Sequence, residues 1–135
     1  NLHSQKGQEL LHNPKASLAF YWPSQGRQIR INGEVEPISE QEANEYFISR
    51  AWKSRIGAWA SKQSQTMKDK WQLERRIAKY SIHFFLRKVP RPPHWSGFRL
   101  KPTSLEFWLE GPFRLHERLL YKKLDNNWHK ERLFP

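Results

Sequence analysis

The sequence contains no cysteine among its 135 residues. Disulfide scaffolds, thiolate metal sites and cysteine nucleophiles are therefore excluded. The longest unbroken apolar run extends only from Leu18 to Trp22, far less than the roughly 20 apolar residues of a membrane-spanning helix. There is also no signal-peptide pattern and no Asn-x-Ser/Thr acceptor. These absences favour a soluble, cytoplasmic protein that has no membrane partner.

Several catalytic and nucleotide-binding motifs are missing as well. The sequence has no Gly-x-Gly-x-x-Gly, no P-loop, no His-Glu-x-x-His and no Gly-x-Ser-x-Gly. No two histidines have the spacing that would let them share a metal ion on one helix. The serine hydrolase, P-loop NTPase and zinc enzyme classes therefore lose most of their support, and we expect no metal site.

Basic residues are in clear excess. Lys and Arg total 24 against 13 Asp and Glu, which gives a formal net charge of +11. This balance predicts anionic partners and leaves nucleic acid, phosphorylated metabolites and acidic lipid open. Hydrophobic residues make up 37% and aromatic residues 14% of the chain, which predicts a packed core rather than disorder and a single domain over residues 1–135.

The hydrophobic pattern of the first 93 residues predicts both helices and strands. Helices are expected over 4–11, after a capping box formed by Ser39 and Glu42, and from Asp69 onward. The run 16–22 reads as a buried strand, followed by a turn and a half-exposed strand over 27–35. The proline-rich stretch 89–93 is expected to be a stiff extended linker.

The residues after this linker predict a β-meander. Turn residues separate its runs at Pro102, at Gly111-Pro112 and at Asp125-Asn126-Asn127. The four expected strands are 97–101, 104–109, 115–122 and 128–133. The whole chain is therefore predicted to be α+β, with more strands than helices.

One candidate anion site lies near the C-terminus. If the strand begins at Arg114, the two-residue period puts Arg114, His116 and Arg118 on one face. Trp108, one strand earlier, could add an aromatic wall suited to a planar, negatively charged ligand. The alternative is an ordinary solvated outer face.

A second candidate site combines Tyr46, Arg50 and Ser54. Tyr46 and Arg50 are four residues apart on the capped helix and so share a face, with Ser54 just past the expected helix end. A phenol, a guanidinium and a hydroxyl are suitable donors for a phosphate monoester. The alternative is that Tyr46 belongs to the core and Arg50 to the surface.

Two weaker features complete the set of candidates. Gln63 and Ser64 could hydrogen-bond a heterocycle or could simply lie in a loop. The basic helix over 70–88 could contact a nucleic-acid backbone, although a soluble helix with outward charges is the simpler interpretation.

In order along the chain, ten segments resemble pyridoxamine/pyridoxine 5′-phosphate oxidase, a family of flavin enzymes. The segments are Asn13-Pro14, LAFYW at 18–22, RQ at 27–28, YFISR at 46–50, SRIGAW at 54–59, SKQS at 61–64, VPRPP at 89–93, EFW at 106–108, RLHER at 114–118 and ERLFP at 131–135. So many segments at family-like spacing make the resemblance highly specific, and it covers the chain from Asn1 to Pro135.

The resemblance implies a split β-barrel homodimer that binds FMN at the subunit interface, here as an incomplete barrel. Residues 1–88 would supply the barrel part and helices that bind FMN and substrate. Residues 89–135 would form the C-terminal meander for dimerisation and substrate binding. FMN would be contacted by Lys6, Gln28, Gln63, Ser64, Trp108 and Arg118.

The resemblance also implies the reaction. Pyridoxamine or pyridoxine 5′-phosphate would be oxidised to pyridoxal 5′-phosphate by hydride transfer from its C4′ carbon to FMN. Molecular oxygen would reoxidise the flavin and yield hydrogen peroxide, and the amine substrate would also release ammonia. Tyr46, Arg50 and Ser54 would hold the substrate phosphate, and the catalytic pair Arg114 and His116 would lie over the pyridine ring.

The sequence departs from the family at two places. Gln5 stands before Lys6 where the family usually has arginine, so one contact to the FMN phosphate is expected to be weakened or lost. The family also carries a long segment before the position of Asn1, and Asn1 is not preceded by methionine. We therefore expect a partial sequence of a working enzyme, with a shortened, inactive relative as the next interpretation.

Two further hypotheses compete with the oxidase. A non-catalytic split-barrel protein that binds a flavin or pyridoxal phosphate would fit the shortened chain and Gln5. A nucleic-acid-binding module would fit the positive charge, but the aromatic residues follow apolar strand patterns and are not interleaved with Lys and Arg.

Overall fold

The structure is a computed structural model that describes residues 1–135, and the chain divides into two compact units. The helical unit comprises Asn1–His12 and Pro37–Phe98, and the sheet unit comprises Asn13–Glu36 and Arg99–Pro135. Each unit therefore combines segments that are far apart in the sequence. The two units are described separately below.

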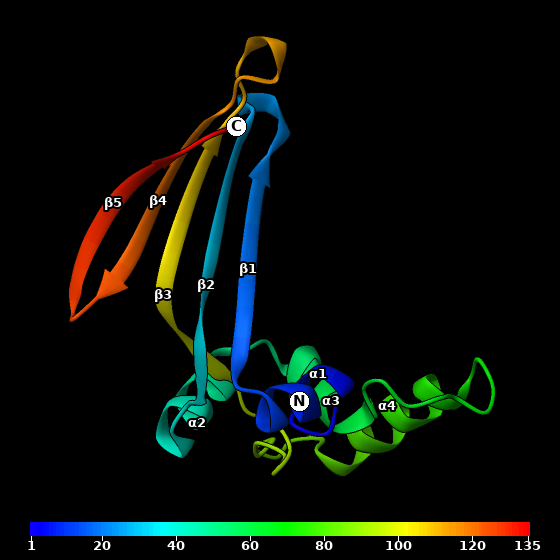
Figure 1. Cartoon of the computed structure of the whole chain (residues 1–135). Helices are drawn as coiled ribbons and strands as arrows, with labels where there is room; N and C mark the ends of the chain where they lie inside the picture. Colours follow the sequence, from blue (N-terminus) through cyan, green and yellow to red (C-terminus); the bar gives the residue numbers. More distant parts are fainter. The chain divides into compact units, whose positions relative to one another are not determined.

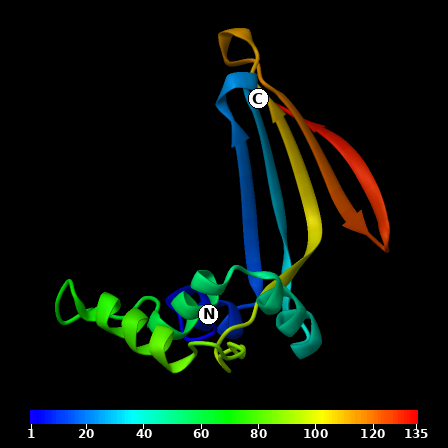
Figure 2. The same ribbon diagram turned by 180° about the vertical axis from the view of Figure 1, so that it is seen from behind.

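The sheet unit is built on one five-stranded sheet, in which the strands follow the order β1-β2-β3-β4-β5 (Figures 1 and 2). The strands are β1 (Lys15–Trp22), β2 (Arg27–Pro37), β3 (Phe98–Leu109), β4 (Glu117–Leu124) and β5 (Asn127–Leu133). β1 and β5 form the two edges, so the sheet is not closed. With four α-helices, this architecture confirms the predicted α+β class, the meander and the incomplete barrel.

All neighbouring strands of the sheet run antiparallel. The register pairs Trp22 with Arg27 in the first hairpin and Leu124 with Asn127 in the last. Between β2 and β3, the Glu110 amide donates to the Gly26 carbonyl at 2.7 Å, and a salt bridge joins Arg30 to Glu106 farther along the same strands. Because a two-residue period fixes the face of every side chain, these pairings determine which residues share a surface.

The predicted turns at both ends of the sheet are confirmed. Pro23–Gln25 forms a single 3-10 turn that ends at Gly26. Asp125 and Asn126 adopt left-handed φ values of 46° and 66° between β4 and β5, as a two-residue hairpin turn requires.

The predicted strand over 16–22 is present, but the prediction that it is buried is wrong. β1 is an edge strand, and Phe20 and Trp22 keep 45% and 41% of their surface exposed. Leu18, Phe20 and Trp22 are two residues apart and so project from the same face of the sheet. The dense apolar run here therefore forms an exposed apolar surface and not a core.

The predicted break at Pro102 is also wrong, because β3 is one continuous strand from Phe98 to Leu109. The pairing of β3 with β4 begins only at Ser104, which lies opposite Lys122. Pro102 therefore lies beyond this ladder, where its missing N–H removes no hydrogen bond to β4.

The helical unit contains α1 (Gln5–His12), α2 (Glu40–Ser49), α3 (Trp52–Ala60) and α4 (Gln72–His83). The predicted cap of α2 is present, since the Ser39 hydroxyl accepts from the Glu42 amide at 3.1 Å. α4 begins at Gln72 and not at Asp69, whose carboxylate instead accepts from the Trp71 amide and pairs with Arg75. None of these helices is long and apolar enough to cross a membrane.

Helix α3 was not predicted from the sequence. Its N-cap residue, Ala51, makes no side-chain capping bond, and Gly57 in its interior has a low helix propensity. Tertiary contacts compensate, because Ile56 of α3 is buried in a cluster with Phe47, Phe84 and Val89. Packing therefore decides this helix where local signals are weak.

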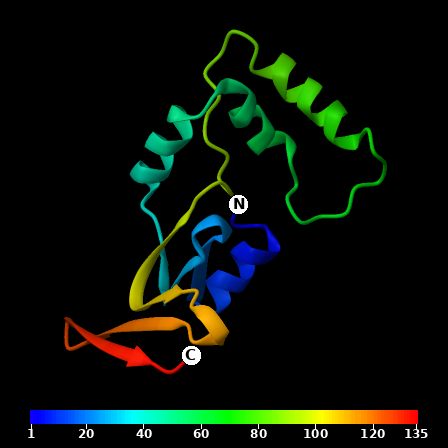
Figure 3. The same ribbon diagram turned by 90° about the horizontal axis from the view of Figure 1, so that it is seen from above.

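The apolar residues of α4, which follow a helical spacing, are only partly buried. Tyr80 and Phe84 pack in the core of the helical unit, where their rings lie 5.7 Å and 5.6 Å from the ring of Trp59. Ile77 and Leu73, one and two turns earlier, stay partly exposed. Residues 61–71, which connect α3 to α4, form a long loop (Figure 3).

Candidate functional site

Three of the residues predicted to bind a cofactor share one face of the sheet. Trp108 of β3 lies opposite Arg118 of β4 in the antiparallel register. Gln28 is two residues from Arg30 and Trp108 is two residues from Glu106, and Arg30 and Glu106 contact each other. Strand alternation therefore places an amide, an indole and a guanidinium on the same surface, which we call the polar face.

A cavity of about 520 Å³ lies at the end of the sheet where β1, β2, β3 and β4 come together. Gln28 and Trp108 are among its lining residues, together with aromatic and aliphatic side chains that include Trp22, Phe107 and Leu109. The volume and the largely apolar lining are those of a small-molecule site.

His116 packs directly against Trp108. The two ring centres are 4.6 Å apart with an interplanar angle of 43°, so the predicted aromatic wall is present beside this histidine. The Gly111 amide donates to Nδ1 of His116 at 3.3 Å. A neutral ring held in this way carries its proton on Nε2, which is then the nitrogen available to a ligand.

The predicted alternation of Arg114, His116 and Arg118 on one strand is wrong. β4 begins only at Glu117, and Arg114 ends a 3-10 turn with a left-handed φ of 63°. The turn that starts at Gly111-Pro112 uses more residues than a hairpin needs, so Arg114 and His116 project from a loop. The loop conformation, and not the strand period, therefore determines where these two side chains lie.

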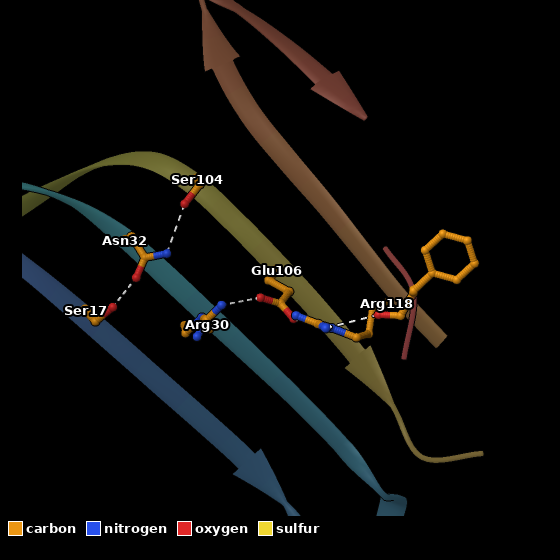
Figure 4. Close-up of polar contacts among 7 residues, drawn as sticks. Ser17, Arg30, Asn32, Ser104, Glu106 and Arg118 are labelled. Carbon is orange, nitrogen blue, oxygen red and sulfur yellow. Dashed lines mark hydrogen bonds and ion pairs between the residues drawn. The ribbon is translucent and has the colours of Figure 1, made fainter. Parts of the chain in front are cut away.

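Arg118 is held by a carboxylate that the sequence analysis did not select. Its Nε and Nη2 atoms lie 2.8 Å and 2.7 Å from Oε1 of Glu106, and Nη1 donates to the Phe134 carbonyl at 3.1 Å. Arg30 binds the other oxygen of the same carboxylate at 2.5 Å. Figure 4 shows this row, in which Glu106 lies between arginines from the two neighbouring strands.

The environment of Glu106 keeps it ionised. The residue is only 6% exposed, and burial alone would raise its pKa. The hydrogen bonds and positive charges of Arg118 and Arg30 outweigh burial and lower the pKa below its ordinary value. The sequence did contain a clue to this residue: Glu106 is a single acidic residue between Leu105 and Phe107. In a strand its side chain therefore projects to the face opposite to theirs.

A second polar contact crosses the same face nearer the other end of the strands. Asn32 of β2 binds the hydroxyl of Ser17 on β1 and donates to the hydroxyl of Ser104 on β3 at 3.0 Å (Figure 4). The polar face therefore ties strands together through side chains as well as through the backbone ladder.

The helical unit brings Tyr46 and Arg50 together, as predicted from their spacing. Both contact the indole of Trp95: the Tyr46 ring centre is 5.9 Å from it, and the Arg50 guanidinium carbon lies 5.2 Å over it. Tyr46 is 62% exposed, so it is not a core residue. Ser54 lies past the end of α2, as predicted, and belongs to the first turn of α3.

Gln63 and Ser64 lie in the loop after α3, as predicted. They line a hollow of about 270 Å³ together with Arg76 of α4. Arg76 donates from Nε to the Ala60 carbonyl at 2.5 Å and so caps the C-terminus of α3. Ser64 has a left-handed φ of 67°, which shows that the loop turns sharply at the predicted residue.

Lys6 lies on α1 with an exposed side chain. The neighbouring Gln5, which stands where the family usually has arginine, donates to Glu9 at 2.9 Å. No group of three or more His, Asp or Glu side chains that could hold a metal ion is present. The candidate residues themselves carry N–H and O–H groups, which can donate hydrogen bonds to anions and heterocycles.

Comparison with known families identifies the chain. The family model described as "Pyridoxamine 5'-phosphate oxidase" matches residues 1–84, and the one described as "Pyridoxine 5'-phosphate oxidase C-terminal dimerisation region" matches residues 95–135. The chain belongs to the pyridoxamine 5′-phosphate oxidase family.

Relatives in this family cover the chain from end to end. A pyridoxine/pyridoxamine 5'-phosphate oxidase from Caulobacter vibrioides is 56% identical over 135 residues, and one from Maricaulis maris is 53% identical over 137 residues. Both matches include 100% of this chain, which spans only 61% and 62% of the lengths of the two relatives.

Solved structures show the same fold. PhzG from Burkholderia lata, in complex with tetrahydrophenazine-1-carboxylic acid, matches with a TM-score of 0.91 at 34% identity and covers 99% of this chain and 65% of its own. A pyridoxamine 5'-phosphate oxidase-related, FMN-binding protein from Nostoc punctiforme matches with a TM-score of 0.73 at 17% identity over 100% of this chain and 70% of its own. The sequence matches and the structural match to PhzG therefore agree on the pyridoxamine 5′-phosphate oxidase family.

Proposed function

We propose that the protein containing this chain oxidises pyridoxamine 5′-phosphate or pyridoxine 5′-phosphate to pyridoxal 5′-phosphate. Oxygen is the electron acceptor, hydrogen peroxide is released, and the amine also yields ammonia. The observation that carries this proposal is the identity of 56% to a named oxidase over the complete chain. The His116–Trp108 pair and the Tyr46–Arg50 pair supply the two kinds of contact that such a substrate needs.

FMN is the cofactor implied by this family, and the residues of the sheet unit suit it. The polar face offers the Gln28 amide, the Trp108 indole and the Arg118 guanidinium to a polar heterocycle. The cavity of about 520 Å³ touches Gln28 and Trp108, but most of its lining side chains, such as Trp22, Phe107 and Leu109, belong to the opposite face of the sheet. When bound, the flavin would accept the hydride and pass electrons to oxygen. Lys6, Gln63 and Ser64 of the helical unit are proposed as further FMN contacts.

The substrate phosphate is assigned to Tyr46, Arg50 and Ser54. A phosphate ester accepts hydrogen bonds, and these residues offer a phenol, a guanidinium and a hydroxyl. Tyr46 and Arg50 both contact the indole of Trp95, so each side chain is already restrained before a ligand binds. This arrangement reduces the entropy lost on binding.

Arg114 and His116 are assigned to the reacting end of the substrate. With Nδ1 of His116 accepting from the Gly111 amide, Nε2 is free to hydrogen-bond the amine or alcohol on the reacting carbon. Arg114 would add positive charge beside the pyridine ring. Both residues belong to the short loop that joins β3 to β4.

The working molecule is proposed to be a cytoplasmic homodimer. The match of residues 95–135 to a dimerisation region supports the dimer. A second copy would place FMN where two subunits meet, as the family resemblance implies.

The reaction is tested with the protein expressed from its complete reading frame and loaded with FMN. Pyridoxine 5′-phosphate should yield pyridoxal 5′-phosphate, followed by its absorbance, together with an equal amount of hydrogen peroxide. Flavin-loaded protein that forms neither product would refute the proposal. Tight binding of the ligand without oxygen uptake would instead indicate a non-catalytic binding protein.

Replacing Arg114 or His116 by alanine tests the assigned roles. Each variant should lose roughly 100-fold or more in kcat/KM, as expected when a proton-handling or charge-stabilising group is removed. Flavin retention, measured by absorbance after gel filtration, should change little. Loss of bound flavin in parallel with activity would contradict the assignment, because it would place these side chains at the cofactor.

A second candidate substrate follows from PhzG, whose structure holds tetrahydrophenazine-1-carboxylic acid. That ligand is named as a carboxylic acid and not as a phosphate ester, so related proteins differ in the anion they bind. The Tyr46–Arg50 pair suits either anion, because guanidinium groups bind carboxylate and phosphate alike through two parallel hydrogen bonds. The identity of 56% to a named pyridoxine/pyridoxamine 5'-phosphate oxidase favours the phosphate ester. Turnover of tetrahydrophenazine-1-carboxylic acid but not of pyridoxine 5′-phosphate would support this second candidate.

A further inference from the structure

The proline-rich segment that follows α4 is firmly attached to α2. The Arg91 guanidinium donates from Nε to the Asn44 side chain at 2.6 Å and from Nη1 to the Trp95 carbonyl at 2.7 Å. The Trp95 amide donates to the Pro92 carbonyl at 2.9 Å. One arginine therefore links the peptide of Trp95 to the helix that carries Tyr46 and that ends at Ser49, next to Arg50.

The same segment is attached to α3. The Trp59 indole donates to the Pro90 carbonyl at 2.8 Å, and a ring nitrogen of His94 lies 3.3 Å from the Ala58 carbonyl. Pro92 is fully buried, and prolines restrict φ before any contact forms. Residues 89–95 are thus a rigid support and not merely a linker.

The indole of Trp95 connects this support to the candidate phosphate site. Its ring packs edge-on against the buried Phe47, with centres 5.0 Å apart. The same ring meets Tyr46 at 5.9 Å and lies beneath the Arg50 guanidinium at 5.2 Å. Trp95 therefore contacts the core and two proposed substrate ligands at once.

We propose that Trp95 is a positioning residue that holds Arg50 and Tyr46 ready to bind the phosphate of the substrate; this inference rests on the proposed function. A guanidinium stacked over an aromatic face keeps the N–H groups at its edge free for an anion. Without the ring, Arg50 gains rotamer freedom that must be lost again when phosphate binds.

The test replaces Trp95 by leucine and by phenylalanine in the complete, FMN-loaded protein. Trp95→Leu removes the aromatic face and should raise the KM for pyridoxine 5′-phosphate about tenfold, which corresponds to about 1.4 kcal/mol. The Ki of inorganic phosphate as a competitive inhibitor should rise by a similar factor. Trp95→Phe keeps a ring and should restore most of both affinities. In all variants kcat and flavin retention should stay close to wild type.

Trp71 provides a matched control. Its exposed indole lies 4.9 Å from the Lys70 ammonium and precedes α4, so it has the same kind of contact without a proposed ligand. Trp71→Leu should leave the KM and the phosphate Ki unchanged. Equal effects of Trp71→Leu and Trp95→Leu would overturn the inference.

A shape-preserving variant guards against simple misfolding of Trp95→Leu. Fluorinated tryptophans placed at position 95 alone weaken the negative potential of the ring face without changing its packing. Phosphate affinity should fall stepwise with the number of fluorines, because the contact with Arg50 is electrostatic. An unchanged affinity across this series would overturn the positioning role.

The outcomes separate this inference from the proposed function. If the wild-type protein does not oxidise pyridoxine 5′-phosphate, the proposed function fails, and calorimetric binding of inorganic phosphate to wild type and Trp95→Leu still decides the role of Trp95. If wild type is active and Trp95→Leu lowers kcat/KM equally for pyridoxine and for its 5′-phosphate, the positioning role fails while the function stands.

Discussion

At the scale of single residues, Glu106 links three neighbouring strands of the sheet unit, and it was not among the predicted site residues. Its carboxylate binds Arg30 of β2 and Arg118 of β4 from its own position on β3. Arg30 and Arg118 keep 49% and 29% of their side-chain surface exposed, so water screens part of the attraction. The arrangement nevertheless fixes Arg118, which is one of the proposed FMN contacts.

Replacing Glu106 by glutamine should lower the free energy of unfolding by about 1–3 kcal/mol at pH 7, because the charge that satisfies two arginines is lost. The folded-state pKa of Glu106 is lowered, so its stabilisation is complete above the ordinary glutamate pKa of about 4.3. It is lost as the pH falls from there through the lower folded pKa. Urea unfolding between pH 7 and pH 3 should therefore show the wild type and Glu106→Gln converging.

Glu131 offers a control for this experiment on the same sheet. It pairs with Lys122 at 3.0 Å, and both side chains are nearly half exposed. Glu131→Gln should change stability by less than about 1 kcal/mol, as surface ion pairs do. A constant difference between Glu106→Gln and wild type at every pH would contradict the role of ionisation.

At the scale of elements, the loop between β3 and β4 determines where the catalytic candidates lie. Gly111 is packed so closely that a Cβ atom there would lie 2.1 Å from the Leu115 carbonyl oxygen. Its amide also holds Nδ1 of His116. The loop can therefore accept no side chain at position 111 without moving His116.

Gly111→Ala should consequently reduce kcat/KM roughly tenfold or more, since small displacements of catalytic groups are costly. The fold, followed by circular dichroism, should be retained. Gly57→Ala is the matched control, because a Cβ at position 57 meets no atom within 4 Å. It should keep activity and add about 0.5–1 kcal/mol of stability by removing a glycine from α3. Full activity of Gly111→Ala would show that the loop does not position His116.

At the scale of the molecule, one face of the sheet is apolar and open. Leu18, Phe20 and Trp22 of β1 are 45%, 45% and 41% exposed. Phe107 and Leu109 of β3 add to the same face and keep 39% and 38% of their surface exposed. A contiguous apolar surface of this kind is a site of association or aggregation.

The 135-residue chain produced alone should therefore bind a hydrophobic dye such as anilinonaphthalene sulfonate and should self-associate at micromolar concentration. Fluorescence titration and sedimentation velocity measure the two effects. Replacing Phe20 and Leu109 by serine should weaken both. A monomeric chain that binds no dye would contradict this expectation and show that the face is covered in solution.

Much of the fold was predictable because local chemistry determines it. The Ser39 cap, the Asp125–Asn126 turn and the half-exposed strand over 27–35 are short-range features, and all three are confirmed. Helix α3 was missed because Ile56 is stabilised by packing and not by a local signal. Ser54 lies past the end of α2 as predicted, but within this unpredicted helix.

Prediction of the candidate site succeeded where spacing along one element was enough. Tyr46 and Arg50, four residues apart, both contact Trp95, although α2 ends at Ser49 and Arg50 is its C-cap residue. Arg114 and His116 were misplaced because a turn with left-handed residues delays the start of β4. The roles of the individual residues in FMN and substrate binding stay predictions.

The sequence alone determined the family, the α+β class and the chemical types of the anion-binding groups. Motifs, hydrophobic periodicity and turn residues depend only on residues that are close together in the sequence. Only the tertiary structure decided that Glu106 joins two arginines and that Trp95 contacts Tyr46 and Arg50. These features depend on which distant segments become neighbours. Burial, ion pairing and ring contacts are properties of such pairs, so they arise only when the chain has folded.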